Sequence, residues 1–149
     1  MGYWNFRRSW KFYTSQVNEV IRLFERYVKE SHNKVDVSKY LALCEQLGQE
    51  PDPNKMPLDA SAFPVEVQVA FFVHDLLSDR WDGASGTYLG KDWSAANFIF
   101  DTYDIEDIKT TIFFAKLYDN ILAKERIEEA SRKQKAEERR AKAKASISR

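Results

Sequence analysis

The strongest constraint in this sequence is an abrupt change of composition after Leu122. Among residues 123–149 only Ile127 and Ile147 are large and apolar, and Ala, Glu, Lys, Arg and Gln fill most other positions. These residues form helices readily, but a helix without an apolar stripe cannot pack on a core. We therefore expect a helical domain at residues 1–122 and a charged helical or partly disordered C-terminal extension at residues 123–149.

The last helix is expected to begin at Asp104, where Asp107 three residues later makes a pair resembling a capping box. Its first half carries the apolar side chains of a core-forming helix, built on Ile108, Ile112, Leu117 and Ile121. A helix continuing to residue 143 would be about 60 Å long. Its second half would be exposed, frayed or available to a partner.

Apolar spacing upstream predicts an all-α fold, a compact helical domain of about five helices. A first helix spans residues 9–30, with Ser9 as N-cap and apolar residues at alternating spacings of three and four. Packing on the domain is favoured over a coiled coil, because three heptads are marginal for one. A second helix follows Asp36 and ends near Gly48, whose type suits the left-handed position after a helix. It is expected to bury Tyr40, Leu41, Leu43, Cys44 and Leu47.

Prolines make residues 49–62 a loop. A third helix begins at Pro64, with Ser61 as a candidate cap, and its apolar residues on most sides indicate a central position; its β-branched residues leave a strand as the alternative. Residues 78–92 contain three of the five glycines and are the least helical part. Asp92 or Ser94 is expected to cap a short helix reaching Tyr103.

The totals limit the possible classes of protein. A 44% apolar and 14% aromatic composition supports a core, and the single cysteine excludes an intrachain disulfide framework. No apolar run has the length of a signal peptide or membrane span, so we expect a cytosolic protein. Residues 45–107 hold 13 acids against 3 Lys/Arg, whereas residues 124–149 hold 5 against 10. This acidic middle either docks on a basic surface or forms solvated loops.

No catalytic constellation is evident, and we expect neither enzyme activity nor a cofactor. His74 in an apolar helix is more typical of a satisfied core or boundary residue than of a base, and Cys44 of a buried inert thiol. The acids at residues 75–82 lack the ligand spacing of an EF-hand. The segment Gly86–Asp92 has too few residues between its glycines for a phosphate loop, and a carboxylate replaces the required hydroxyl.

Three phrases carry a family resemblance: residues 51–57 (PDPNKMP), 63–71 (FPVEVQVAF) and 79–93 (DRWDGASGTYLGKDW). They resemble small tail and baseplate assembly proteins of tailed bacteriophages, including tail assembly chaperones, over about residues 44–122. The resemblance implies a non-enzymatic role through protein–protein contacts with other tail proteins of the tape-measure or hub type, or with another copy as a homo-oligomer. It implies the host cell cytoplasm during assembly and leaves open whether the protein stays in the virion.

Two surfaces are candidates for these contacts. The glycine-rich segment 79–93 offers amphipathic rings on an adaptable backbone, although its rings also have the option of covering the core. The C-terminal helix offers basic side chains. The candidate partner-binding residues are Arg80, Trp81, Tyr88, Trp93, Arg132, Lys135, Arg139 and Arg140. An alternative function is a nucleic-acid-binding regulator using this helix, against which stand its five interspersed glutamates and a sequence pI near 6.7.

Overall fold

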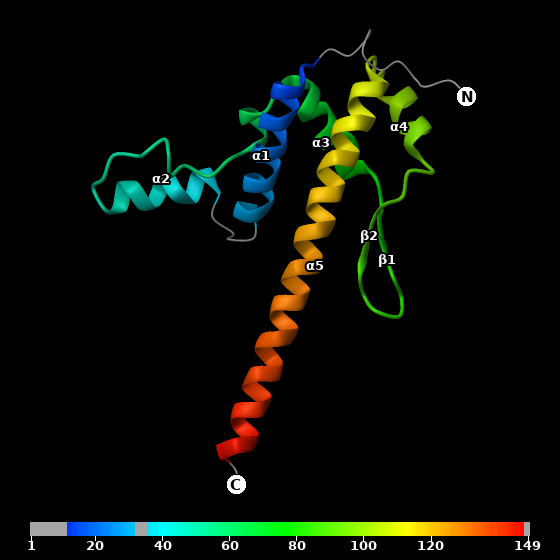
Figure 1. The fold of residues 1–149 in the computed structure, drawn as a ribbon. Helices are drawn as coiled ribbons and strands as arrows, with labels where there is room; N and C mark the ends of the chain where they lie inside the picture. The colour runs from blue at the N-terminus through cyan, green and yellow to red at the C-terminus, as the bar shows by residue number, and fades with distance from the viewer. Residues whose placement is uncertain (1–11, 32–35, 148–149) are drawn as a thin grey trace. The chain divides into compact units, whose positions relative to one another are not determined.

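The computed structural model describes residues 12–31 and 36–147, and the chain divides into two compact units, Met1–Asp59 and Ala60–Arg149 (Figure 1). The described residues form five α-helices and one antiparallel two-stranded sheet. The expected helical character is therefore confirmed, but an all-α class is wrong, because residues 79–91 form a β-hairpin. The expected cap Ser9 lies outside the described residues.

The first unit contains helices α1 (Thr14–Ser31) and α2 (Val37–Gln46). On α1 the buried side chains are Val20, Phe24 and Val28, which repeat every four residues as on one face of a helix. Asp36 caps α2 by accepting a hydrogen bond from the N–H of Lys39 at 2.8 Å. Gly48 follows α2 in the left-handed region, at φ 62°, as its type predicts.

The expected burial along α2 is largely wrong. Cys44 is the buried residue of this helix, whereas Leu41, Leu43 and Leu47 are 40%, 52% and 60% exposed. The sequence places apolar residues on much of α2, but in the described chain this helix meets too little protein to cover them all. Tyr40 is half-buried, and its hydroxyl bonds both the N–H and the C=O of Asp52.

The proline-rich segment after α2 is held to α1 by two charged side chains. Arg26 and Glu30 form an ion pair at 2.6 Å. Arg26 donates to the carbonyl of Met56, and Glu30 accepts from the N–H of Leu58. Prolines remove backbone donors from this segment, so side chains of α1 take over part of its hydrogen bonding.

The second unit has its core between α3 (Val65–Leu76) and α5 (Ile108–Ile147), which pack together. A short 3₁₀ turn, η2 (Ala60–Ala62), precedes α3. Pro64 occupies the N-cap position of this helix, so Ser61 is not its N-cap residue. Phe71 of α3 meets Tyr118 of α5 edge to face at 4.9 Å, and it also meets Phe63, just before α3, edge to face at 5.0 Å. The short helix α4 (Ala96–Thr102) covers one end of the core.

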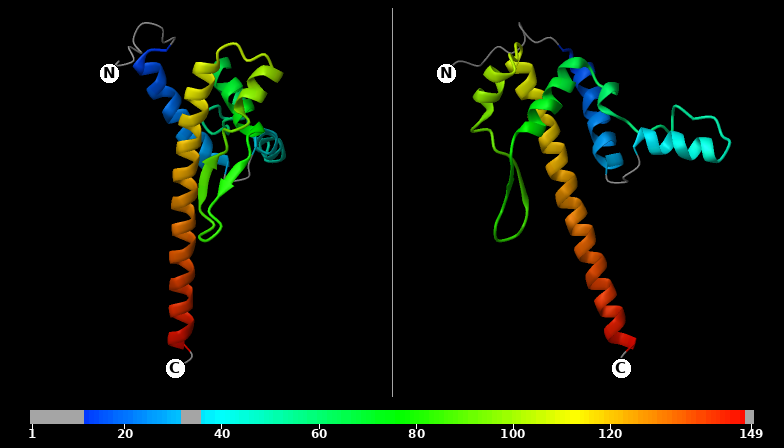
Figure 2. Two further views of the ribbon diagram at one scale, coloured as in Figure 1. Left: turned by 90° about the vertical axis from the view of Figure 1, so that its right-hand side faces the viewer. Right: turned by 180° about the vertical axis from the view of Figure 1, so that it is seen from behind.

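The hairpin comprises β1 (Asp79–Trp81) and β2 (Tyr88–Lys91) and lies beside α5, which β2 contacts (Figures 1 and 2). Asp79 pairs with Lys91, Arg80 with Gly90 and Trp81 with Tyr88, with a register shift after Arg80. At the turn, Asp82 accepts hydrogen bonds from the N–H groups of Ala84 and Ser85 and from the Ser85 hydroxyl. An aspartate at this place organises a tight turn through its own side chain.

The start of α5 differs from expectation for a local reason. Asp104 has φ 48°, a left-handed conformation, and the N–H of Ile105 returns to the carbonyl of Phe100. This closes α4 in the manner of a Schellman motif, so no helix begins at Asp104. Asp107 instead accepts from the N–H of Thr110 at 3.1 Å, and α5 begins at Ile108. Neither Asp92 nor Ser94 caps α4; the two bond one another instead.

Helix α5 runs for 40 residues without interruption, about 60 Å. The composition change at residue 122 therefore falls inside one continuous helix. Residues 131–146 are all exposed. Within the Ala60–Arg149 unit, the described elements lie along the first part of α5, and its orange-to-red end extends past the hairpin (Figures 1 and 2).

Candidate functional site

A buried polar cluster joins α3, the hairpin and α5 at the carboxylate of Asp119. Its Oδ1 accepts from the Tyr88 hydroxyl at 2.7 Å and contacts His74 Nε2 at 3.0 Å. Its Oδ2 accepts from the backbone N–H of Lys91 at 3.1 Å. Because an ionised carboxylate only accepts, Nε2 is the protonated nitrogen of His74. One side chain of α5 thus collects a donor from α3 and two from β2.

The cluster keeps Asp119 ionised although it is 8% exposed. Burial opposes the charge, but the hydrogen bonds from His74, Tyr88 and the Lys91 N–H outweigh it and lower the pKa of the Asp119 carboxyl below its ordinary value. Burial and the adjacent Asp119 carboxylate raise the pKa of the Tyr88 hydroxyl, so it stays a donor. Hydrogen bonds to charged groups stabilise by about 1.5–3 kcal/mol each, which makes this cluster the firmest attachment of the hairpin.

The close approach of β2 to α5 depends on Gly90. Its φ is 92°, and a Cβ added there would lie 2.7 Å from Asp119 Oδ2. A residue with a side chain would both strain the backbone and strike the carboxylate. Next to it, Lys91 Nζ pairs with Asp79 at 2.8 Å and donates to the Leu77 carbonyl at 3.0 Å. The base of the hairpin is therefore fixed on both strands.

The outer part of the hairpin is held by Arg126 of α5. Its guanidinium lies 4.2 Å from the ring centroid of Tyr88 and 5.5 Å from that of Trp81, and the two rings meet at 5.1 Å. Such cation–π contacts stabilise by about 0.5–2 kcal/mol. The nitrogen Nη1 of Arg126 is buried and has no hydrogen-bond partner among the described residues. The contacts between hairpin and helix thus leave one donor of Arg126 unused.

A groove lies between the hairpin turn and α5, next to the rings of Trp81 and Tyr88. Its volume is about 680 Å³, within the range of ligand-binding pockets. The hairpin contributes Trp81 and residues 85–88, and α5 contributes Arg126, Ile127, Ala130, Ser131, Lys133 and Gln134. Trp81 and Ile127 are 53% and 49% exposed. We call this the hairpin–helix groove, and its walls offer apolar surface with a few basic and polar groups.

The candidate residues of the 79–93 segment divide into inward and outward ones. Trp81 and Arg80 are exposed and remain available to a partner. Tyr88 is 4% exposed and its hydroxyl is engaged with Asp119, so it offers a partner little surface, although it contributes to the groove wall. Trp93 packs against the core cluster of Val73 and Phe100 and carries Lys116 at 5.2 Å from its ring, so it too mainly covers the core.

The candidate residues of the C-terminal helix do not act as one surface. Arg132 pairs with Glu125, seven residues earlier, at 2.8 Å, and Lys133 pairs with Glu129 at 2.6 Å. Lys135, Arg139 and Arg140 are exposed. The glutamates thus compensate the basic charge near the hairpin, and the uncompensated cations lie toward the helix end.

His74 is a buried residue, as its position in an apolar helix predicts, and one of its two ring nitrogens is hydrogen-bonded. It is 3% exposed, it packs edge to face on Tyr118 at 4.9 Å, and its second nitrogen has no hydrogen-bond partner among the described residues. His74 does not line the groove. Within residues 12–31 and 36–147, no three His, Cys, Asp or Glu side chains gather as metal ligands do.

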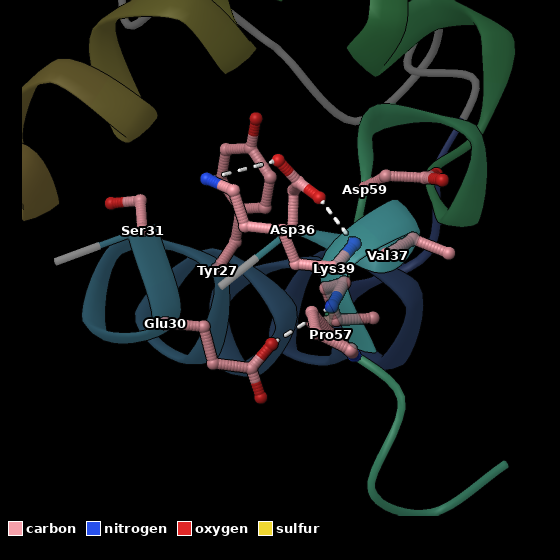
Figure 3. A pocket seen from close by; sticks show the side chains of 9 residues that line it. Tyr27, Glu30, Ser31, Asp36, Val37, Lys39, Pro57 and Asp59 are labelled. Carbon is pink, nitrogen blue, oxygen red and sulfur yellow. Dashed lines mark hydrogen bonds and ion pairs between the residues drawn. The ribbon is translucent and has the colours of Figure 1, made fainter. Parts of the chain in front are cut away.

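A second pocket, of about 450 Å³, lies in the first unit (Figure 3). Tyr27, Glu30 and Ser31 of α1 face Asp36, Val37 and Lys39 at the start of α2, with residues 57–59 closing it. Its carboxylates serve the backbone: Glu30 accepts from Leu58 and Asp36 from Lys39. The Lys39 N–H lowers the pKa of Asp36. These groups join the elements of the unit, and we assign them no ligand.

Sequence reasoning missed Asp119, Arg126 and the groove. Asp119 is the only acid among residues 108–123, and an acid alone on an apolar helix face was a signal for a buried polar contact. The dipeptide Asp82-Gly83 between aromatic residues was a signal for a hairpin. No local signal pairs Arg126 with Tyr88, because the contact joins positions 38 apart.

In comparisons with known proteins, no protein-family model matches the chain, and neither the curated proteins nor the solved structures contain a match. Among the helices of the described residues, none is long and apolar enough to cross a membrane.

Proposed function

We propose that this chain is a non-enzymatic bacteriophage tail or baseplate assembly protein, or a minor structural protein, acting through protein–protein contacts. The observation that best supports contact-making is the hairpin, which is anchored on α5 by buried hydrogen bonds yet presents an exposed Trp81 beside a groove. A fixed aromatic side chain next to a groove is the usual form of a binding hot spot. The phage context rests on the resemblance of residues 44–122.

The expected partners are other tail proteins of the tape-measure or hub type, or a second copy of the chain. The protein would meet them in the host cytoplasm during assembly. The exposed end of α5 adds a second surface, because residues 131–146 have no described residue covering them. A rigid helix that reaches beyond its own core is suited to packing on another protein.

Co-expression with the tail proteins encoded beside it, followed by pull-down, tests this function. We expect at least one tail protein to be retained by the full chain. A Trp81→Ala variant should retain less, with Trp93→Tyr as a control that keeps an aromatic side chain over the core. Retention of no tail protein by the full chain, or equal retention by Trp81→Ala, would count against the proposal.

A nucleic-acid-binding regulator is the second candidate. It is favoured by the exposed cations Lys135, Arg139, Arg140, Lys142 and Lys144, for which no ion pair occurs within the described part of the chain. Binding through phosphates weakens steeply with salt. A mobility-shift assay at about 50 mM salt tests this function, and the absence of any shift would remove it.

A further inference from the structure

We propose that the hairpin–helix groove binds a partner peptide through one acidic side chain, whose carboxylate pairs with Arg126. A neighbouring apolar side chain of the peptide contacts Trp81 and Ile127. The inference rests on the proposed function only in taking the partner to be a protein. It specifies what the groove recognises, a carboxylate next to an apolar side chain, which the family resemblance does not specify.

The first argument is the state of Arg126. Its guanidinium contacts the faces of two rings, at 4.2 and 5.5 Å from their centroids, and it forms no ion pair with any carboxylate of the described residues. A guanidinium has five N–H donors in a planar fork that matches a carboxylate, and stacking on Tyr88 and Trp81 leaves its edge unpaired. The nitrogen Nη1 is buried without a hydrogen-bond partner among the described residues, and an unpaired buried donor costs stability.

The second argument concerns how much negative charge the groove accepts. Lys133, the other cation on its wall, is already paired with Glu129 at 2.6 Å. Asp82 at the base of the turn carries a carboxyl whose pKa the Ser85 hydroxyl and two backbone N–H groups lower. A groove wall with one cation that forms no ion pair suits a single carboxylate. It does not suit a nucleic-acid backbone, which brings a charge about every 1.7 Å of duplex axis.

The third argument is the apolar surface beside the cation. Trp81 and Ile127 are both about half exposed and both line the groove. Trp and Arg, which both line this groove, are residue types enriched at binding hot spots. The ligand class that combines a carboxylate with apolar groups on an extended chain is a peptide with Asp or Glu next to an apolar residue.

The test uses the full chain and a displayed library of random peptides. Selected peptides are synthesised with a fluorescent label, and their affinity is measured by anisotropy. Two variants of Ala130, an exposed groove residue one helical turn after Arg126, are compared. Ala130→Glu brings a carboxylate to Arg126 at i,i+4 spacing, whereas Ala130→Gln has the same size and no charge. Neither variant removes a contact of the hairpin.

We expect the selected peptides to share an acidic residue beside an apolar one. Their affinity should fall at least tenfold with Ala130→Glu and less than threefold with Ala130→Gln. Changing the peptide's acid to its amide should cause a similar loss, with little further loss in the Ala130→Glu variant, because both changes remove the same ion pair.

Three results would overturn the inference: no selected peptide, selected peptides without an acid, or equal losses with Glu and Gln. Displacement of a bound peptide by a single-stranded oligonucleotide at moderate salt would assign the groove to nucleic acid instead. The proposed function is judged separately. A tail protein that is still retained by Ala130→Glu contradicts the groove's role and leaves the function standing, whereas no retention by the wild-type chain contradicts the function.

Discussion

At the scale of single residues, Asp119 determines where the hairpin lies. It accepts hydrogen bonds from Tyr88, His74 and the Lys91 backbone, and so it connects α5 to both α3 and β2. Its value lies in joining parts of the chain that are far apart in sequence. Each of its donors is therefore a place where one atom can be removed and the effect measured.

Removing the Tyr88 hydroxyl should weaken this attachment. Tyr88→Phe keeps the ring that Arg126 stacks on but deletes the donor 2.7 Å from Asp119. We expect a loss of about 1–2 kcal/mol in the free energy of unfolding, measured in urea. Tyr103→Phe is the matched control, because Tyr103 is 50% exposed; its change should stay within about 0.5 kcal/mol. Equal effects of the two changes would contradict the assignment.

The charge of Asp119 gives the stability a dependence on pH. Its pKa in the folded chain lies below the ordinary value of 3.8, so its contribution is fully present above that value and is lost as pH falls through the folded pKa. We expect the difference in melting temperature between wild type and Asp119→Asn to be constant at neutral pH and to shrink below about pH 4. A difference that keeps its size down to strongly acidic pH would exclude this role.

Gly90 tests the distance between β2 and α5. Gly90→Ala introduces a Cβ 2.7 Å from Asp119 Oδ2 at a φ of 92°, and we expect a destabilisation of about 2–4 kcal/mol from backbone strain and the displaced carboxylate. Gly83→Ala is the control, because nothing lies within 4 Å of its added Cβ. Thermal unfolding followed by tryptophan fluorescence measures both. A tolerated Gly90→Ala would mean that the strand is free to move off the helix.

At the scale of elements, α5 combines two different helices in one. Up to about residue 122 it packs on α3 and buries Phe114 and Ala115 completely. Beyond residue 130 it has no buried residue in the described range 131–146, and its stability there comes from helix propensity and charge pairs. Between the two parts, Arg126 ties the helix to the hairpin. Along its length the helix thus first packs in the core, then holds the hairpin, and then continues as an exposed segment.

This division predicts how truncation acts. Ending the chain after Ala130 should change the free energy of unfolding by less than about 0.5 kcal/mol, because the described residues that are lost, 131–146, are exposed. Ending it after Leu122 should cost about 1 kcal/mol more, because it also removes the Arg126 contacts with Tyr88 and Trp81. Urea unfolding of the two shortened chains measures the difference. Equal stabilities would mean that Arg126 does not hold the hairpin.

At the scale of the whole molecule, the helices could be predicted and the contacts between distant segments could not. Helical spacing located α1, α2 and α3, and the type of Gly48 fixed the end of α2, because these signals lie within a few residues of one another. The hairpin was missed because its strands have three and four residues, too short for alternation to show. The burial of α2 was overpredicted, because amphipathic spacing says which side is apolar and not whether protein covers it.

The candidate site shows the same limit. Trp81 and Arg80 were found as exposed residues of a glycine-rich segment, but Tyr88 was assigned to the surface although its hydroxyl is needed inside. An aromatic residue in this segment is equally compatible with a surface position and with a buried one. What decides between them is the presence of Asp119, 31 residues further along the chain, and no local pattern carries that information.

The position of Asp119 after all of its partners has a consequence for synthesis. His74 and Tyr88 precede it by 45 and 31 residues, so the ribosome releases the hairpin before the residue that anchors it. At about 5–20 residues per second, the hairpin waits roughly 2–6 s for its anchor. During that interval Trp81 and Tyr88 have no Arg126 to stack on, and their rings are open to any chaperone or nascent neighbour within reach.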